Sequence, residues 1–130
     1  MNLLNLSKLT LKPSEPSDFE AIKLIDEKCF GESNSIDLEN TYVAYHDGTM
    51  IAKVRLELYN GEGGIFGLGV LPEFRNQGYG KGLLDNSIFE LRKQGAKKIF
   101  LQVVTENENA LGLYLHTGFI IDSCMEYYQI

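Results

Sequence analysis

The sequence has few cysteines, few prolines and no long apolar run. Its two cysteines, Cys29 and Cys124, lie far apart, which argues against a disulfide framework or a cysteine-based metal site and predicts reduced thiols in a cytoplasmic protein. No apolar segment approaches the roughly 20 residues of a membrane helix. Residues 1–8 lack a basic start and a small-residue cleavage site, so we expect no signal peptide and no membrane association.

An excess of basic residues is also missing. The formal net charge is −6, whereas nucleic-acid binding needs clustered Lys and Arg, so nucleic acid is not an expected partner. A cationic amine substrate is compatible with this balance. At 130 residues, 44% of them apolar, the chain is long enough for one domain with its own core. We therefore expect a single domain over 1–130, with 1–8 as a loose N-terminal extension.

Helical and alternating apolar patterns predict a mixed α/β protein. Ser17 or Asp18 can cap the first helix, whose expected apolar side holds Phe19, Ile22, Leu24, Ile25 and Cys29. The pair Asp47-Gly48 predicts a hairpin. The expected order is strand 7–12, helix 18–30, a loop over 31–40, strands 41–46, 50–59 and 65–71, helix 79–94, strand 99–104, a helix containing Tyr114, and strands 119–122 and 125–129.

The segment from Val70 to Gly82 is the most informative part of the chain. It runs from an apolar strand through a turn into a helix, with glycine at 78, 80 and 82 and the basic residues Arg75 and Lys81 beside them. Glycine lets the backbone approach a ligand closely, and free amides at a helix start attract phosphate. A tight turn without a ligand is the alternative. The spacing fits neither a Walker loop nor a dinucleotide fingerprint, which would need glycine where Leu83 stands.

A second block runs from Asn107 to Phe119. Asn107 can cap a helix, and Ala110, Leu113 and Tyr114 share one helix face. A capped helix with a buried tyrosine is an equally good explanation of this block taken alone.

Together the two blocks resemble the GNAT family of N-acetyltransferases. The family pattern (Q/R)-x-x-G-x-(G/A) is matched by Arg75 to Gly80, and N-x-x-A-x-x-L-Y-x-x-x-G-F by Asn107 to Phe119. The resemblance implies a twisted mixed sheet of about six to seven strands, splayed at its two central strands, with helices on both faces. The block 65–75 and the ending 124–130 look like the C-terminal half of tandem bacterial members of this family.

The resemblance also implies a site that binds acetyl-CoA without a metal. Pantetheine would lie along the central strand, the pyrophosphate would sit on the amides of 77–81, and the phenol of Tyr114 would protonate the leaving thiolate. A core aromatic is the alternative role for Tyr114. The implied cofactor contacts are Leu68, Gly69, Val70, Arg75, Asn76, Gln77, Gly78, Tyr79, Gly80, Lys81 and Asn107.

The general base stays open at this point. Family members often carry a glutamate on the central strand, but residues 64–70 contain no carboxylate, which leaves Glu57, Glu126 or a water chain. His116 falls on the wrong side of its helix from Tyr114. The expected acceptor is a primary amine on a small molecule or peptide. The short segment 31–40 suggests an open acceptor side that a second copy could complete as a homodimer. A CoA-binding regulatory or structural module with little turnover is the competing hypothesis.

Overall fold

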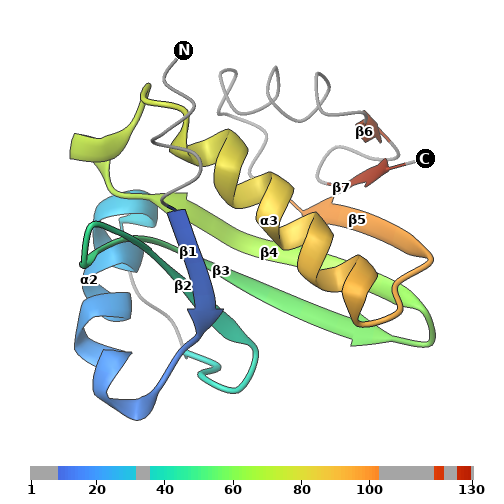
Figure 1. Cartoon of the computed structure of the whole chain (residues 1–130), viewed down its shortest axis with the longest axis horizontal. Helices are drawn as coiled ribbons and strands as arrows, with labels where there is room; N and C mark the ends of the chain where they lie inside the picture. Colours follow the sequence, from blue (N-terminus) through green and yellow to red (C-terminus); the bar gives the residue numbers. More distant parts are fainter. Residues whose placement is uncertain (1–8, 32–35, 103–118, 122–125, 130) are drawn as a thin grey trace.

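The computed structural model of the chain describes residues 9–31, 36–102, 119–121 and 126–129. Within these ranges the strands form one seven-stranded sheet, in the order β1-β2-β3-β4-β5-β7-β6 (Figure 1). The elements are β1 Leu9–Pro13, the short 3₁₀ turn η1 Pro16–Asp18, α2 Phe19–Phe30, β2 Thr41–His46, β3 Thr49–Tyr59, β4 Glu62–Val70, a second 3₁₀ turn η2 Pro72–Phe74, α3 Tyr79–Lys93, β5 Lys98–Gln102, β6 Phe119–Ile121 and β7 Glu126–Gln129.

The sheet is mixed, as the sequence predicts. Strands β1 to β4 pair antiparallel, β4 and β5 pair parallel, and β7 lies between β5 and β6, antiparallel to both. The parallel pair is possible because α3 carries the chain back across the sheet between β4 and β5. The predicted order of elements is therefore confirmed within the described residues, and the helix expected to contain Tyr114 lies outside them.

Two tight turns build the antiparallel half. Asp47 and Gly48 both have positive φ, at 51° and 80°, and so do Asn60 and Gly61, at 50° and 78°. Positive φ at both central residues is the signature of the type I′ hairpin turn, which matches the twist of the strands it joins. The predicted hairpin at Asp47-Gly48 is confirmed.

The central strand begins earlier than the sequence pattern predicts, at Glu62 rather than residue 65. The reason is close packing at two glycines. A Cβ on Gly63 would lie 3.1 Å from Ala96 and Leu91, and one on Gly64 would lie 2.6 Å from the Phe66 ring. Glycine is usually unfavourable in strands, so the sequence pattern does not indicate a strand at residues 62–64. Here glycine fits because neighbouring side chains occupy the space that a Cβ would need.

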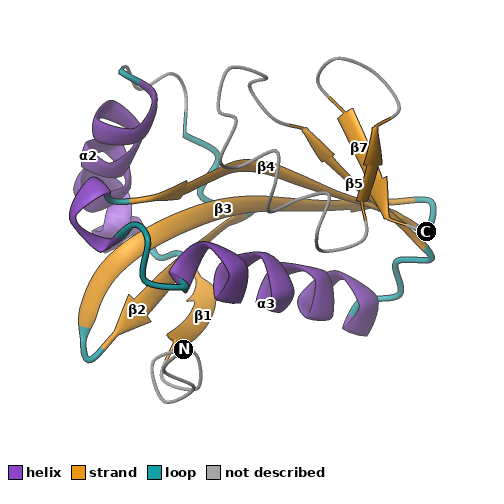
Figure 2. Ribbon diagram, turned by 90° about the horizontal axis from the view of Figure 1, so that it is seen from above, coloured by secondary structure: helices purple, strands orange, loops and turns teal. Residues whose placement is uncertain are grey.

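The main core lies between the sheet and α3. Alternate residues of β3, namely Ala52, Val54 and Leu56, are buried on this side, together with Leu83, Leu84 and Leu91 of α3. Helix α2 covers the opposite face of the sheet, so helices lie on both faces (Figure 2). The sheet is thus fixed on one side by α3 along its length, and α2 contacts β3 and β4 on the other.

Two details of α2 differ from the prediction. Phe19 and Leu24 are 40% and 50% exposed, so the buried side is narrower than expected and rests on Ile22 and Ile25. Asp18 does not cap α2 with its side chain; it accepts a 2.8 Å hydrogen bond from the Glu15 amide and closes the 3₁₀ turn before the helix. A polar residue before a helix can satisfy either element, and here the earlier turn takes it.

Candidate functional site

Strand β4 has two halves with different surroundings. From Glu62 to Ile65 it pairs with β3 on one side and β5 on the other, and the last β4–β5 pair is Ile65 with Leu101. Over Phe66–Val70, here called the open half, the described residues pair with β3 alone. The register to β3 shifts in this half, and Gly67 has a φ of +57°. A bulge thus bends β4 where its ladder with β5 ends.

Part of the main chain at the open half faces away from β3. The Leu71 amide donates to the Ile51 carbonyl of β3 at 2.9 Å, so residue 70 and, by strand alternation, residue 68 turn their backbone groups away from β3. The Val70 carbonyl accepts a hydrogen bond from Arg75 Nε at 3.0 Å and one from Cys29 Sγ at 3.3 Å. The Val70 amide and the groups of Leu68 are the ones positioned for an added extended chain.

The turn after β4 ends in a helix start without a side-chain cap. Asn76 and Gly78 have φ of 63° and 89°, and α3 begins directly after Gly78. The first helical bond runs from the Gly82 amide to the Gly78 carbonyl at 3.1 Å, so the amides before Gly82 have no partner within the helix. The first turn carries no acidic residue. Amides without a helical partner and the helix dipole both favour an anion at this position.

The side chains of this turn are mostly engaged with the protein. Gln77 donates to the Glu73 carbonyl at 3.2 Å, and Lys81 Nζ lies 2.8 Å from Asp85 at an exposed site. The Tyr79 side chain is buried, with 3% exposure. Of the predicted cofactor contacts in this turn, Tyr79 therefore offers its amide and not its ring, and Arg75 is held against the end of β4.

Helix α2 packs tightly on the open half. A Cβ on Gly69 would lie 3.1 Å from Cys29 Sγ and 3.3 Å from the Phe30 ring, so a larger residue at 69 would press against α2. Burial raises the pKa of the Cys29 thiol, and the neighbouring Arg75 and Lys53 oppose this rise only in part. Cys29 is thus a neutral donor to the Val70 carbonyl at physiological pH.

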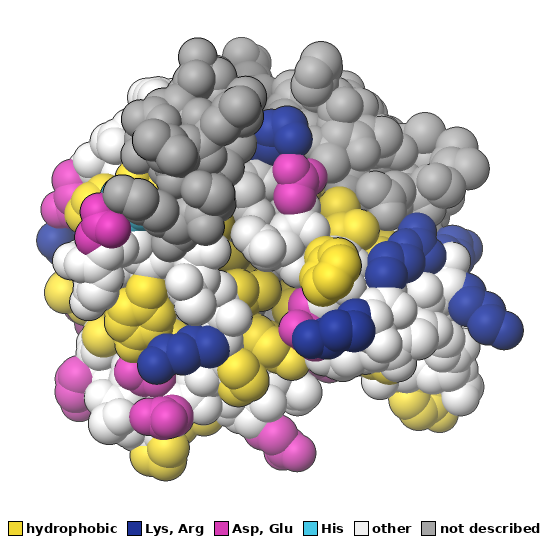
Figure 3. All heavy atoms as spheres, in the orientation of Figure 1, with side chains coloured by type: hydrophobic (Ala, Val, Ile, Leu, Met, Phe, Trp, Pro, Cys, Tyr) yellow, Lys and Arg dark blue, Asp and Glu magenta, His cyan; other side chains and the backbone are white. Residues whose placement is uncertain are grey.

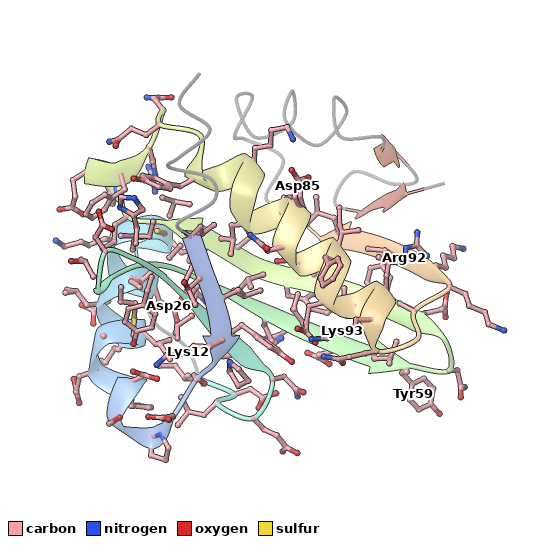
Figure 4. The ribbon with its side chains drawn as sticks, in the orientation of Figure 1. Lys12, Asp26, Tyr59, Asp85, Arg92 and Lys93 are labelled. Atoms are coloured by element: carbon pink, nitrogen blue, oxygen red, sulfur yellow. The ribbon has the colours of Figure 1, made fainter. Side chains whose placement is uncertain are left out.

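An ion pair that the sequence reasoning missed connects α2 to the bulge. Lys53 of β3 pairs with Asp26 of α2, and both side chains are 12% exposed. Asp26 is labelled in Figure 4. Lys53 Nζ also lies 5.4 Å from the centre of the Phe30 ring and 3.1 Å from where a Gly67 Cβ would be. The available signal was a carboxylate at position 26, on the same helical side as Ile22 and Cys29.

The two candidate bases occupy different rows of the sheet. Glu57 pairs across β3 with Gly64, and its carboxylate lies 2.7 Å from Arg55 Nε. Glu126 pairs with Gln102, one residue past the last β4–β5 pair, so its backbone lies closer to the opening. Asn107, Tyr114 and His116 lie outside the described residues.

Basic side chains gather near the C-terminal end of α3 and the start of β5 (Figure 3, with Arg92 and Lys93 labelled in Figure 4). Arg92 donates to the carbonyls of Ala96 and Lys97, at 3.2 and 2.8 Å. This arrangement satisfies carbonyls after a helix end and complements the helix dipole. The described residues contain no group of side chains that could hold a metal ion, and no helix among them is long and apolar enough to cross a membrane.

Within the described residues, the chain is an α/β protein whose two parallel central strands stop pairing after Ile65–Leu101, next to a helix start without a side-chain cap, an arrangement suited to an anionic ligand. The model of the acetyltransferase (GNAT) family matches residues 4–119, and the chain belongs to this family. The predicted resemblance and fold class are thereby confirmed.

Relatives support the same assignment. The ribosomal protein bS18-alanine N-acetyltransferase of Escherichia coli is 32% identical over 93 residues, which are 72% of this chain and 62% of that protein. The chain therefore spans less than two thirds of that relative. The crystal structure of the Escherichia coli enzyme matches with a TM-score of 0.76 at 25% identity, over 88% of this chain and 79% of the other. The PaiA N-acetyltransferase of Thermoplasma acidophilum, solved with coenzyme A, matches with a TM-score of 0.75 at 16% identity, over 92% and 96%.

Proposed function

We propose that the chain is an N-acetyltransferase that moves the acetyl group of acetyl-CoA to a primary amine. The observation that carries this proposal is the uncapped start of α3, placed directly after the open half of β4 in a chain of the GNAT family. The pyrophosphate of CoA would accept hydrogen bonds from the amides at the start of α3. The pantetheine arm would pair with Leu68 and Val70 as an added strand does.

The proposed reaction is direct attack of the amine on the thioester, in a complex that holds both substrates. The nitrogen forms a bond to the acetyl carbon, the carbon–sulfur bond breaks as the tetrahedral intermediate collapses, and the thiolate takes a proton. In this proposal Tyr114 gives that proton and Asn107 holds the pantetheine arm, as the family pattern implies. The amine must lose a proton before it attacks.

Glu126 is our preferred group for that second proton transfer, directly or through water. The Glu126 backbone pairs with Gln102, one residue beyond the last β4–β5 pair. Glu57 instead pairs with Gly64, which lies within the β4–β5 ladder, and its carboxylate is paired with Arg55. The experiment compares Glu126→Gln with Glu57→Gln: the first should lower the acetylation rate most at low pH, where the amine is most protonated, and the second should change it little. Equal effects of the two substitutions would contradict this choice.

The acceptor is tested by a screen that follows release of the CoA thiol. Peptides that begin with alanine are included because the Escherichia coli relative is named for an alanine of a ribosomal protein. Polyamines, aminoglycosides and amino acids complete the set. We expect turnover with a small or flexible primary amine, and a preference for bulky apolar or anionic acceptors would contradict it. A homodimer that completes the acceptor side stays a prediction, tested by light scattering at several concentrations.

A CoA-binding module with little turnover is the second candidate. The observation in its favour is that Glu57, the candidate base on β3, is already paired with Arg55 and so is less suited to accept a proton from the amine. This candidate predicts that CoA binds while every acceptor in the screen fails. The two candidates therefore differ in turnover and agree on binding.

A further inference from the structure

The first residue of α3 carries a side chain that points into the protein. Tyr79 follows Gly78 directly, and its ring is 3% exposed within the main core. The Phe74 ring of η2 meets it edge-on, with the ring centres 6.3 Å apart. The residue whose amide stands at the helix start is thus anchored by its own ring, because that ring has little freedom to move.

The polar end of this ring reaches a histidine from another part of the chain. The Tyr79 hydroxyl lies 3.2 Å from His46 Nδ1, and the two ring centres are 5.0 Å apart. His46 is the last residue of β2 and pairs with Leu9 of β1 and Thr49 of β3. Its side chain is 16% exposed. The hydrogen bond therefore ties the start of α3 to a rigid part of the antiparallel sheet.

The other polar contacts of the turn reach less far along the chain: Arg75 bonds to the Val70 carbonyl at the end of β4, five positions back. Gln77 bonds within the turn, to Glu73, and Lys81 bonds within the helix, to Asp85. Both contacts are exposed and local, and exposed pairs of this kind contribute little. The partly buried contact between Tyr79 and His46 instead joins the start of α3 to β2, 33 positions away in the sequence.

We propose that His46 is a positioning residue for the CoA pyrophosphate. Through the Tyr79 hydroxyl it sets where the amides at the start of α3 stand relative to the open half of β4. The proposal rests on the proposed binding of CoA at this turn. Because amides must lie within hydrogen-bond distance of both phosphates at once, loss of the contact should weaken the hold on the pyrophosphate and spare the hold on pantetheine.

The test uses Tyr79→Phe, His46→Ala and the double variant, titrated with CoA by calorimetry. Tyr79→Phe keeps the buried ring and removes only the hydroxyl, so the fold should persist. Each single variant should bind CoA about 3- to 10-fold more weakly, which is the usual range for one lost hydrogen bond. The double variant should be no weaker than the worse single variant, because both remove the same contact. His46→Asn, whose amide can replace Nδ1, should recover most of the affinity.

Tyr45→Phe is the matched control. It deletes one hydroxyl from the same strand, where Tyr45 lies 3.2 Å from Asp18 and not near the turn. CoA affinity should stay unchanged in this variant. Pantetheine, which lacks the pyrophosphate, is the second probe; its affinity, followed by NMR titration, should be the same in all variants.

Two results would overturn the inference. One is unchanged CoA affinity in folded Tyr79→Phe and His46→Ala. The other is an equal loss of affinity for CoA and pantetheine, which would mean that the contact supports the fold in general. Failure of the wild-type chain to bind CoA would contradict the proposed function itself. The wild-type titration is done first, so this failure is distinguished from a failure of the inference about His46.

Discussion

The two halves of β4 are made from similar residues and do different things. In Glu62–Ile65 the strand is paired on both sides, and Gly63 and Gly64 are glycines because neighbouring side chains fill their space. In the open half, Gly67 bends the strand and Gly69 makes room for α2. Glycine thus allows close packing in the paired half, whereas in the open half it allows a bend in the strand and the approach of α2.

The two halves also use their backbone groups differently. The backbone groups of the paired half bond to β3 and β5. The open half keeps groups of Leu68 and Val70 turned away from β3, and α2 supports it through Cys29 and the buried pair Asp26–Lys53. If the open half binds CoA as we propose, substitutions in the two halves should have different consequences for stability and for CoA binding.

The largest effect on stability should come from the support under the open half. Lys53→Met leaves the Asp26 carboxylate largely buried without its ammonium, and removing one partner of a buried pair costs about 3 kcal/mol. Urea unfolding measures this loss. Arg55→Met is the matched control, because the Arg55–Glu57 pair is 39% and 45% exposed and should contribute less than about 1 kcal/mol. Equal losses in the two variants would contradict the role given to Lys53.

The largest effect on rate should come from Tyr114→Phe. In our proposal this residue protonates the leaving thiolate at the open half, so kcat should fall by roughly 10²-fold while CoA affinity stays nearly constant. Single-turnover acetylation and calorimetry on the same preparation check both parts. Full kcat in this variant would assign Tyr114 to packing.

A smaller effect is expected in the paired half. Gly64→Ala places a methyl group 2.6 to 2.9 Å from the rings of Phe66 and Phe100, and overpacking of this kind costs about 1–3 kcal/mol. Thermal unfolding should show the loss, and CoA affinity of the folded fraction should be unchanged. A Gly64→Ala variant that is as stable as the wild type would break the contrast between the halves.

The smallest effect concerns the Cys29 thiol beside the open half. Burial raises the pKa of this thiol above its ordinary value of 9.0, so the folded chain holds the thiol proton more strongly than the unfolded chain does. At pH 7 the thiol is protonated in both the folded and the unfolded chain, so its shifted pKa does not change stability there. The free energy of unfolding should fall as the pH rises through 9 and above, where the unfolded chain loses the proton first. In a Cys124→Ser background, iodoacetamide should alkylate the folded chain more slowly than the urea-unfolded chain at pH 8. Equal rates would show that the thiol is not protected.

The sequence predicts those features that depend on neighbours along the chain. The hairpin at Asp47-Gly48 and the turn at Gly78 follow from backbone freedom within a few residues. The contacts missed are those between distant residues: Lys53 with Asp26, Cys29 with Gly69, and His46 with Tyr79. No pattern along the chain shows that a glycine faces a helix or that a tyrosine at a helix start meets a strand end. The predicted roles of Asn107 and Tyr114 stay predictions.

The most direct test of the central claim is calorimetry of CoA with Gly80→Asp. Gly80 lies in the first turn of α3, where an aspartate favours the helix, so the fold should be kept or stabilised. Its charge should repel the pyrophosphate and weaken CoA binding on the order of 10- to 100-fold, the range of charge-assisted hydrogen bonds. Phe89→Asp, at a 68% exposed position of the same helix, adds the same charge away from the turn and should bind CoA like the wild type. Unchanged CoA affinity in folded Gly80→Asp would contradict the placement of CoA at the open half of β4.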